Sequence, residues 1–259
     1  MLKAFYSSAT GMRAQELLID NTANNLANVN TTGFKAKKMN FADLLYDTVN
    51  RPGAAVGDGQ IQPVGLQIGS GVRTVSTNSI YTQGTPTETE IPTHMAIEGD
   101  GFFRVQRGSQ VAFTRDGSFT RNDQGQLVNG DGFQLDPPIQ IPTQASDITI
   151  SQQGAVSYVV DGTAATGGEI QLVRFANPEG LQNIGSNLFL ATDASGDEIP
   201  GSAGEDGLGT IRQNYLEGSN VEVVSELVSL ITAQRAYEIN SRAIRAGDEM
   251  LSAASELVR

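Results

Sequence analysis

Both ends of the chain carry apolar residues at intervals of seven, and this spacing restricts the possible folds more than any other feature of the sequence. At the N-terminus, one line of large apolar residues consists of Phe5, Met12, Ile19 and Leu26. The line three residues earlier consists of Leu2, Ala9, Glu16 and Ala23. Large residues on one line and mostly small residues on the other are typical of the seam of a coiled coil.

The C-terminus repeats this pattern over a longer stretch. One line consists of Val223, Leu230, Tyr237, Ile244, Leu251 and Val258. Its partner line consists of Ala233, Asn240, Gly247 and Ala254. Ser219 or Asn220 can cap the start of this helix, and Glu222 lies in the first turn, where an acidic residue suits the helix dipole.

Small residues beside large ones allow two helices to approach closely. We therefore expect the terminal helices to pack on each other, either parallel or antiparallel. The alternative is that two unrelated amphipathic helices cover one globular core. Polar residues such as Glu16, Gln234 and Asn240 narrow the apolar stripe. A lone helix pair with so narrow a stripe is marginal, which indicates helices that need further copies of themselves.

Between the helical ends, short β-prone runs alternate with Gly, Asp, Asn and Pro. The runs are 72–76, 95–97, 102–105, 111–114, 118–121, 133–135, 148–150, 156–160, 170–175 and 188–191. Alternating apolar and polar residues within them favour antiparallel strands with one face in water. No helical pattern interrupts these runs, which argues against a parallel sheet.

Residues 46–70 contain five glycines and two prolines, which predicts an extended, loop-like stretch outside the core. The expected fold class is therefore α+β, with terminal heptad helices paired as a coiled coil and an antiparallel β domain inserted between them. Three parts are expected. Residues 1–40 with 216–259 form the helical domain, residues 41–94 with 200–215 form the extended stretch and a connecting β segment, and residues 95–199 form the β domain.

The pair Asp-Gly occurs three times shortly before a phenylalanine, at Asp100, Asp116 and Asp131. Asp-Gly suits the positive φ angles of tight hairpin turns. The repetition predicts three turns of a β-meander, with each phenylalanine anchoring the strand that follows.

Composition excludes several classes of function. The chain has 17 Lys plus Arg against 29 Asp plus Glu, a net charge of −12, which argues against binding to nucleic acid or to anionic lipid. It has no cysteine and one histidine, which excludes disulfides, thiolate metal sites and sites built from several histidines. The N-terminus lacks the apolar run of ~7–15 residues of a cleaved secretory signal, so none is expected.

No motif predicts a catalytic, cofactor or metal site. His94 has no partner that spacing identifies. The segments 122–127 and 193–198 resemble calcium loops only faintly, because neither ends in the glutamate of the full ligand pattern. The glycines at 57–59 and 69–71 lack the further glycine and the flanking strand and helix of a dinucleotide loop.

Several segments together resemble the bacterial flagellar axial proteins, in the rod and hook branch. The N-terminal segment 8–35 contains Asn-Asn-Leu-Ala-Asn at 24–28 and Thr-Gly-Phe-Lys at 32–35. Segments 217–221 and 234–240 resemble the C-terminal end of the family, and segments 96–103 and 114–119 resemble its middle. The signature residues are Asn24, Asn25, Leu26, Asn28, Gly33 and Phe34. Arg51, Pro52 and Gly53 belong to a stretch that resembles an insertion of distal-rod members, and the chain is too short for the outer domain of a hook subunit.

This resemblance implies a structural subunit of the distal rod rather than an enzyme, with no cofactor. Copies would polymerise helically into a tube that transmits motor torque to the hook through rings in the peptidoglycan and outer membrane. The implied partners are further copies, proximal-rod and hook proteins, those rings, the rod cap and the type III export apparatus. The implied location is the flagellar basal body, crossing the periplasm, with no nucleic-acid partner and no direct membrane insertion. The expected assembly residues are Phe5, Met12, Ile19, Leu26, Leu230, Tyr237, Ile244, Leu251 and Val258.

Two alternatives stay open. One is a proximal-rod or hook protein of the same family. The other is an unrelated secreted β-rich protein, either an adhesin or a carbohydrate-active enzyme, which should be a stable monomer that binds a glycan.

Overall fold

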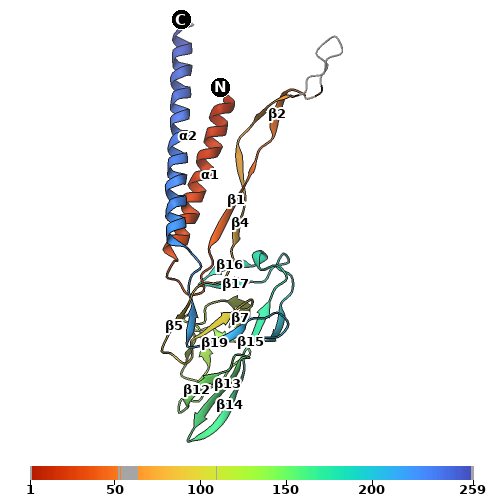
Figure 1. The fold of residues 1–259 in the computed structure, drawn as a ribbon, viewed down its shortest axis with the longest axis vertical. Helices are drawn as coiled ribbons and strands as arrows, with labels where there is room; N and C mark the ends of the chain where they lie inside the picture. The colour runs from red at the N-terminus through yellow and green to blue at the C-terminus, as the bar shows by residue number, and fades with distance from the viewer. Residues whose placement is uncertain (1, 52, 54–63, 109, 258–259) are drawn as a thin grey trace. The chain divides into compact units, whose positions relative to one another are not determined.

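The computed structural model describes residues 2–51, 53, 64–108 and 110–257. It consists of two compact units (Figure 1), a helical unit of Met1–Leu26, Lys37–Asn78 and Glu222–Arg259 and a β unit of Ala27–Ala36 and Ser79–Val221. The α+β class, with a helix at each end of the chain and many antiparallel strands, is confirmed. Among the described residues, no helix has both the length and the apolarity needed to cross a bilayer.

The helical unit contains the helices α1 (Leu2–Ala27) and α2 (Val223–Leu257), which run in opposite directions. Asn25 of α1 donates a hydrogen bond to Glu226 of α2. A Cβ atom added to Gly11 would lie 3.1 Å from Asn240, and one added to Gly247 would lie 2.7 Å from Phe5. Residue numbers thus rise along α1 as they fall along α2, and the small residues Gly11 and Gly247 permit the close approach.

The second heptad line expected on α1 does not lie in a buried seam. Ala9, Glu16 and Ala23 are exposed, whereas Ala14, Thr22 and Asn25 are buried. The reason is that α1 contacts two elements rather than one. Besides α2, it lies against a strand ribbon, which shifts the buried face of the helix around its axis.

That ribbon consists of two strand pairs. Strand β1 (Lys37–Asp43) pairs with β4 (Val72–Ser79), and β2 (Tyr46–Asn50) pairs with β3 (Leu66–Gly69). The prediction of a loop-like stretch at 46–70 is wrong for β2 and β3, which form an antiparallel pair. Every residue of β2 is exposed, so this strand lies outside the core, as expected.

The β unit is built on one antiparallel sheet with the strand order β16-β17-β8-β7-β11-β10-β9, in which β15 also pairs with β7 and with β18. These strands are β7 (Phe102–Arg107), β8 (Gln110–Thr114), β9 (Thr120–Arg121), β10 (Leu127–Val128), β11 (Gln134–Leu135), β15 (Gln171–Arg174), β16 (Gln182–Gly185), β17 (Leu188–Leu190) and β18 (Ile199–Ser202). A short 3-10 helix, η1 (Pro178–Gly180), precedes β16.

The other strands of the β unit form smaller sheets. Three strands pair in the order β12 (Ser146–Ile150), β13 (Ala155–Val160) and β14 (Thr163–Glu169). Two further pairs are β6 (Met95–Glu98) with β19 (Thr210–Gln213) and β5 (Pro86–Glu88) with β20 (Tyr215–Glu217). All the β-prone runs expected from the sequence overlap strands of the structure.

The Asp-Gly motifs have different roles from those expected. Only Asp131-Gly132 turns between strands that pair with each other, β10 and β11. Strand β6 pairs with β19 rather than with β7, and β8 pairs with β7 and β17 rather than with β9. The prediction of a three-turn meander is therefore wrong. Of the phenylalanines that follow these motifs, Phe102 and Phe119 are buried, and Phe133 is partly buried and packs against the core.

Candidate functional site

The heptad residues expected to form an assembly interface are only partly covered within one chain. Phe5, Met12, Ile19, Leu26, Leu230 and Ile244 are half-buried. Tyr237 and Leu251 remain 41% and 38% exposed. Val258 lies outside the described residues. Their role in assembly stays a prediction.

A second set of apolar residues on α2 is exposed to solvent. It consists of Val224 (69% exposed), Leu227 (43%), Val228 (58%), Ile231 (51%) and Ile239 (59%). The ribbon adds Leu45, Tyr46, Val49, Leu66 and Ile68, which are also exposed. Exposed apolar residues in such number on a helix and a ribbon are typical of a surface that another protein covers. The exposed apolar residues of α2 and the ribbon are therefore candidates for contact with another protein chain.

The signature residue Asn25 joins three elements of the helical unit. Its side chain is 1% exposed. Its amide oxygen accepts a hydrogen bond from the Lys37 backbone N–H at 2.9 Å, and its amide nitrogen donates to the Lys37 carbonyl and to Glu226 Oε1, each at 2.9 Å. An aspartate could not donate, so only an amide makes all three bonds.

In the β unit, the signature segment 32–34 lies against the motif that begins at Thr114. Gly33 has a φ of +66°, and a Cβ atom there would lie 2.6 Å from the backbone nitrogen of Asp116. Thr32 donates its hydroxyl hydrogen to Asp116 at 3.0 Å. Phe34 is buried. Segments 32–34 and 114–119 are therefore in direct contact, and Gly33 is required because a side chain there would collide with Asp116.

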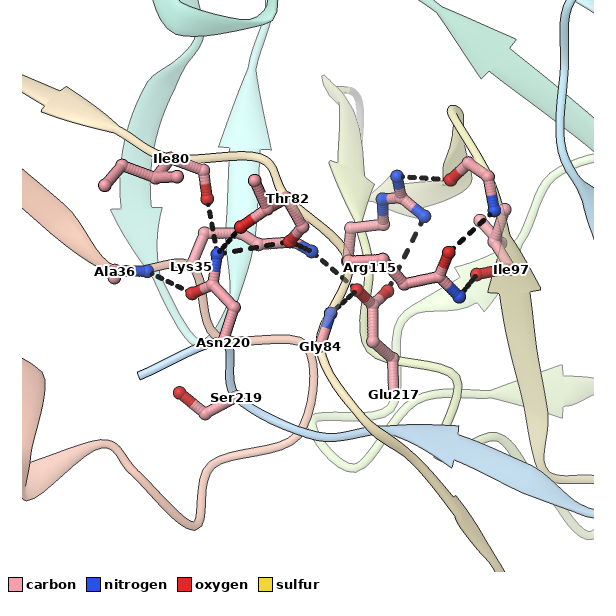
Figure 2. Close-up of polar contacts among 12 residues, drawn as sticks. Lys35, Ala36, Ile80, Thr82, Gly84, Ile97, Arg115, Glu217, Ser219 and Asn220 are labelled. Atoms are coloured by element: carbon pink, nitrogen blue, oxygen red, sulfur yellow. Dashed lines mark hydrogen bonds and ion pairs between the residues drawn. The ribbon is translucent and has the colours of Figure 1, made fainter. Parts of the chain in front are cut away.

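A buried cluster of Lys35, Arg115, Glu217 and Asn220, here called the junction cluster, lies next to this contact (Figure 2). Lys35 Nζ lies 2.5 Å from Glu217 Oε1, and Arg115 Nη1 lies 3.5 Å from Glu217 Oε2. The three charged side chains are no more than 3% exposed. The backbone N–H of Gly84 also donates to Glu217 Oε1, at 2.9 Å. One carboxylate thus compensates two buried cations.

The cations of the cluster are also held by backbone oxygens. Lys35 Nζ donates to the Thr82 carbonyl at 2.8 Å, and Arg115 Nη2 donates to the Gly99 carbonyl at 2.7 Å. Burial lowers the pKa of Lys35 and of Arg115 from their ordinary values, while the charge of Glu217 acts in the opposite direction. A buried charge destabilises the fold unless it is paired, so both Lys35 and Arg115 depend on the carboxylate of Glu217.

Asn220 completes the junction cluster with hydrogen bonds to the backbone. Its oxygen accepts from the Ala36 N–H at 2.7 Å, and its nitrogen donates to the carbonyls of Ile80 and Thr82 at 2.8 and 3.1 Å. The cluster therefore binds together the segment that follows α1 in sequence, the segment that precedes α2 and the segment 80–84 (Figure 2).

The remaining candidates are the stretch 51–53 and His94, and their described residues form no catalytic or metal-binding arrangement. In the stretch 51–53, Arg51 is exposed, Gly53 has a φ of +83° with open space around it, and Pro52 lies outside the described residues. His94 contacts Thr89 at 3.1 Å, and burial lowers its pKa. Across the part of the chain that the structure describes, no group of three or more His, Cys, Asp or Glu side chains could hold a metal ion.

Sequence reasoning did not identify Arg115, Glu217 and Asn220 as a cluster with Lys35. Each of these residues lies in one of the family-like segments 32–35, 114–119 and 217–221. Charged and amide side chains are seldom buried, so their presence in these segments was the signal that could have marked them. Their pairing was not visible, because Lys35 and Glu217 are separated by 182 positions in the chain.

Three families match the sequence. Residues 5–35 match the family described as flagella basal body rod protein, residues 96–158 match flagellar hook protein FlgE/F/G D1 domain, and residues 212–257 match flagellar basal body rod FlgEFG protein C-terminal. The chain is 48% identical to the flagellar basal-body rod protein FlgG of Caulobacter vibrioides, covering 99% of each chain. It is 44% identical to the FlgG of Borreliella burgdorferi over the whole of both chains, and 37% identical to that of Bacillus subtilis, again over the whole of both.

Proposed function

The chain belongs to the FlgG family of flagellar basal-body rod proteins, and from that premise we propose that it is a structural subunit of the distal rod. It polymerises helically into the tube that transmits motor torque to the hook. The observation that carries this function is the exposed apolar surface of the helical unit, which a single chain leaves uncovered.

The finer parts of this function follow from the same surface. The terminal helices of many copies pack as nested coiled coils through the heptad residues from Phe5 to Val258. The three-part division at residues 1–40, 41–94 and 95–199, with their C-terminal counterparts, is the organisation of each subunit. Arg51, Pro52 and Gly53 lie in the stretch that packs between neighbouring copies.

The proposed partners beyond further copies are the proximal-rod and hook proteins, the bushing rings of the peptidoglycan and outer membrane, the rod cap and the type III export apparatus. The acidic segment 46–215, with 8 arginines and 19 acidic residues, supports an outward-facing and well-solvated β unit. No step of this function requires a catalytic residue or a cofactor.

Substitution of a seam residue tests the function. Ile244→Asp places a charge on a half-buried position of α2 and is expected to abolish rod assembly and swimming while leaving the circular dichroism of the β unit intact. Ile199→Asp is the matched control, because it makes the same change at a 44% exposed position of β18. Normal swimming of the Ile244→Asp strain would contradict the proposal.

Purified basal bodies separate the two alternatives. The quantity and axial position of the protein in them distinguish a distal-rod subunit from a proximal-rod or hook subunit. A stable monomer that binds a glycan would support the unrelated β-rich protein instead.

A further inference from the structure

A groove on the helical unit carries two arginines that form no ion pair with any described residue. It has a volume of about 350 Å³ and lies between α1 and the ribbon, and it is lined by Tyr6, Arg13, Leu17, Leu44, Val72 and Arg73. Tyr6 is 59% exposed and Leu17 is 36% exposed. Neither Arg13 nor Arg73 takes part in any ion pair among the described residues. We call this site the arginine groove; it suits a segment that is both apolar and acidic.

The C-terminal end of α2 is such a segment. The contacts of Asn25 with Glu226, Gly11 with Asn240 and Phe5 with Gly247 set the register of the two helices. In that register, the first described residue of α1 lies opposite Met250, so residues 251–257 continue beyond α1 by about 10 Å. Figure 1 shows α2 extending past the N-terminal end of α1. Among the described residues, positions 251–257 therefore have no helix of their own copy beside them, whereas Glu249 and Met250 lie opposite the first turn of α1 and are exposed.

The chemistry of residues 248–257, here called the acidic end, complements the groove. It contains Asp248, Glu249 and Glu256 and no basic residue. Glu249 and Glu256 are seven positions apart and therefore lie on one side of the helix, about 10 Å apart along it. Met250, which is 58% exposed, lies beside that line.

We infer that the acidic end of one copy docks into the arginine groove of the next copy, with Met250 entering the apolar part and Glu249 and Glu256 facing the arginines. This inference rests on the proposed function, since it names the partner of the helical surface. A head-to-tail contact between two different patches does not pair two copies symmetrically, and it generates a helical polymer when the rotation from copy to copy does not close a ring.

Cysteine cross-linking tests this contact. Because the sequence has no cysteine, any disulfide must form between the introduced residues. The full chain carrying Leu17→Cys and Met250→Cys is expressed in cells that lack their own copy, and basal bodies are oxidised and separated without reductant. Within one copy, Leu17 lies opposite residue 234, about 24 Å along α2 from Met250, which is too far for a disulfide. A ladder of cross-linked copies is therefore the expected result.

The matched control pairs Leu17→Cys with Ser225→Cys, an exposed position near the other end of α2. That pair is expected to give no ladder. Assembled rods without a ladder from the Leu17–Met250 pair, or equal ladders from both pairs, would overturn the docking contact. Failure of the unsubstituted chain to form rods would overturn the proposed function instead.

Charge reversal provides an independent test. Glu249→Arg is expected to reduce the amount of protein in rods, since it places a third cation near Arg13 and Arg73. Adding Arg73→Glu to this variant is expected to restore rod formation, because the pair regains opposite charges. A double variant that assembles no better than either single variant would contradict the inference.

Discussion

Glu217 illustrates how one residue can decide the stability of the β unit. Its carboxylate, 1% exposed, faces the cations of Lys35 and Arg115 and accepts a backbone hydrogen bond from Gly84. The cluster as a whole holds two positive charges and one negative charge. Since a charge removed from water is tolerated only when it is paired, the stability of the cluster depends on this single anion.

Neutralising that anion should therefore be costly. Glu217→Gln leaves two buried cations without a counter-charge and is expected to lower the free energy of unfolding of the protein by about 3–5 kcal/mol. Denaturant unfolding followed by circular dichroism measures this change. Glu198→Gln is the control, because it breaks a partly exposed ion pair with Arg104 and should cost less than about 1 kcal/mol. Equal effects would contradict the role of Glu217.

Tyr81 predicts a dependence of stability on alkaline pH. Burial raises the pKa of Tyr81 from 10.0 to about 12, against smaller opposing effects of a hydrogen bond with Ser79 and the charge of Arg115. The folded protein therefore holds this proton more tightly than the unfolded chain. Its contribution to stability is complete below pH 10 and is lost as the pH rises to about 12.

The Tyr81→Phe variant tests this dependence. Its free energy of unfolding is expected to fall less steeply than that of the parent protein between pH 10 and 12, because it lacks the group that titrates. Denaturant unfolding at a series of pH values gives the two slopes. If stability falls with pH at the same slope in both proteins, the pKa of Tyr81 is not raised in the folded state.

At the scale of elements, α1 is defined by the two surfaces it contacts. One side approaches α2 at Gly11 and Phe5, and another meets the ribbon, where the Thr10 hydroxyl accepts a hydrogen bond from Val72 at 3.4 Å. The heptad pattern correctly indicated a close approach of small and large residues between the helices. It did not predict that Ala9, Glu16 and Ala23 are exposed. A heptad pattern reports only contacts between helices, and α1 also contacts strands.

The close approach of the helices can be tested at Gly247. A Cβ atom there would lie 2.7 Å from the Phe5 ring, so Gly247→Leu is expected to force α1 and α2 apart and to reduce the protein recovered in rods. Ala246→Leu is the control, because it introduces the same side chain at the neighbouring exposed position. Sedimentation of assembled rods measures both variants, and equal recovery would argue against a tight helix crossing.

At the scale of the whole molecule, the two units differ in how completely each buries its apolar residues. The β unit has a contiguous core that includes Met95, Phe103, Phe119 and Leu172, all fully buried. Of the buried apolar residues, the helical unit contributes only Ala14 and Ala233 among those described, while many of its large apolar residues are exposed. A unit without its own core depends on neighbours for stability.

Hydrogen exchange on the dilute monomer should show this difference. Residues 2–26 and 223–257 are expected to exchange rapidly, while the strands from Met95 to Gln213 are protected, because only the latter are held by a core. Assembled rods should show protection in both. Helices as protected in the monomer as the strands would indicate that one chain closes its own helical surface.

Much of the β unit could be predicted, because strand-forming runs are local patterns. The third Asp-Gly motif was interpreted correctly, since hairpin turns depend on adjacent residues. The first two were not, because β6 and β8 take partners from distant parts of the chain. Strand β14 was missed because its small residues give no alternating pattern, and it forms by pairing with β13.

By itself, the sequence determined the helical ends, the strand-rich middle and the family, since periodic burial and contiguous motifs can be read along the chain. Only the tertiary structure decided which side of α1 is buried and that Lys35, Arg115 and Glu217 share one site. The physical reason is that a buried charge requires a counter-charge in space, and the path of the folded chain selects which residue provides it.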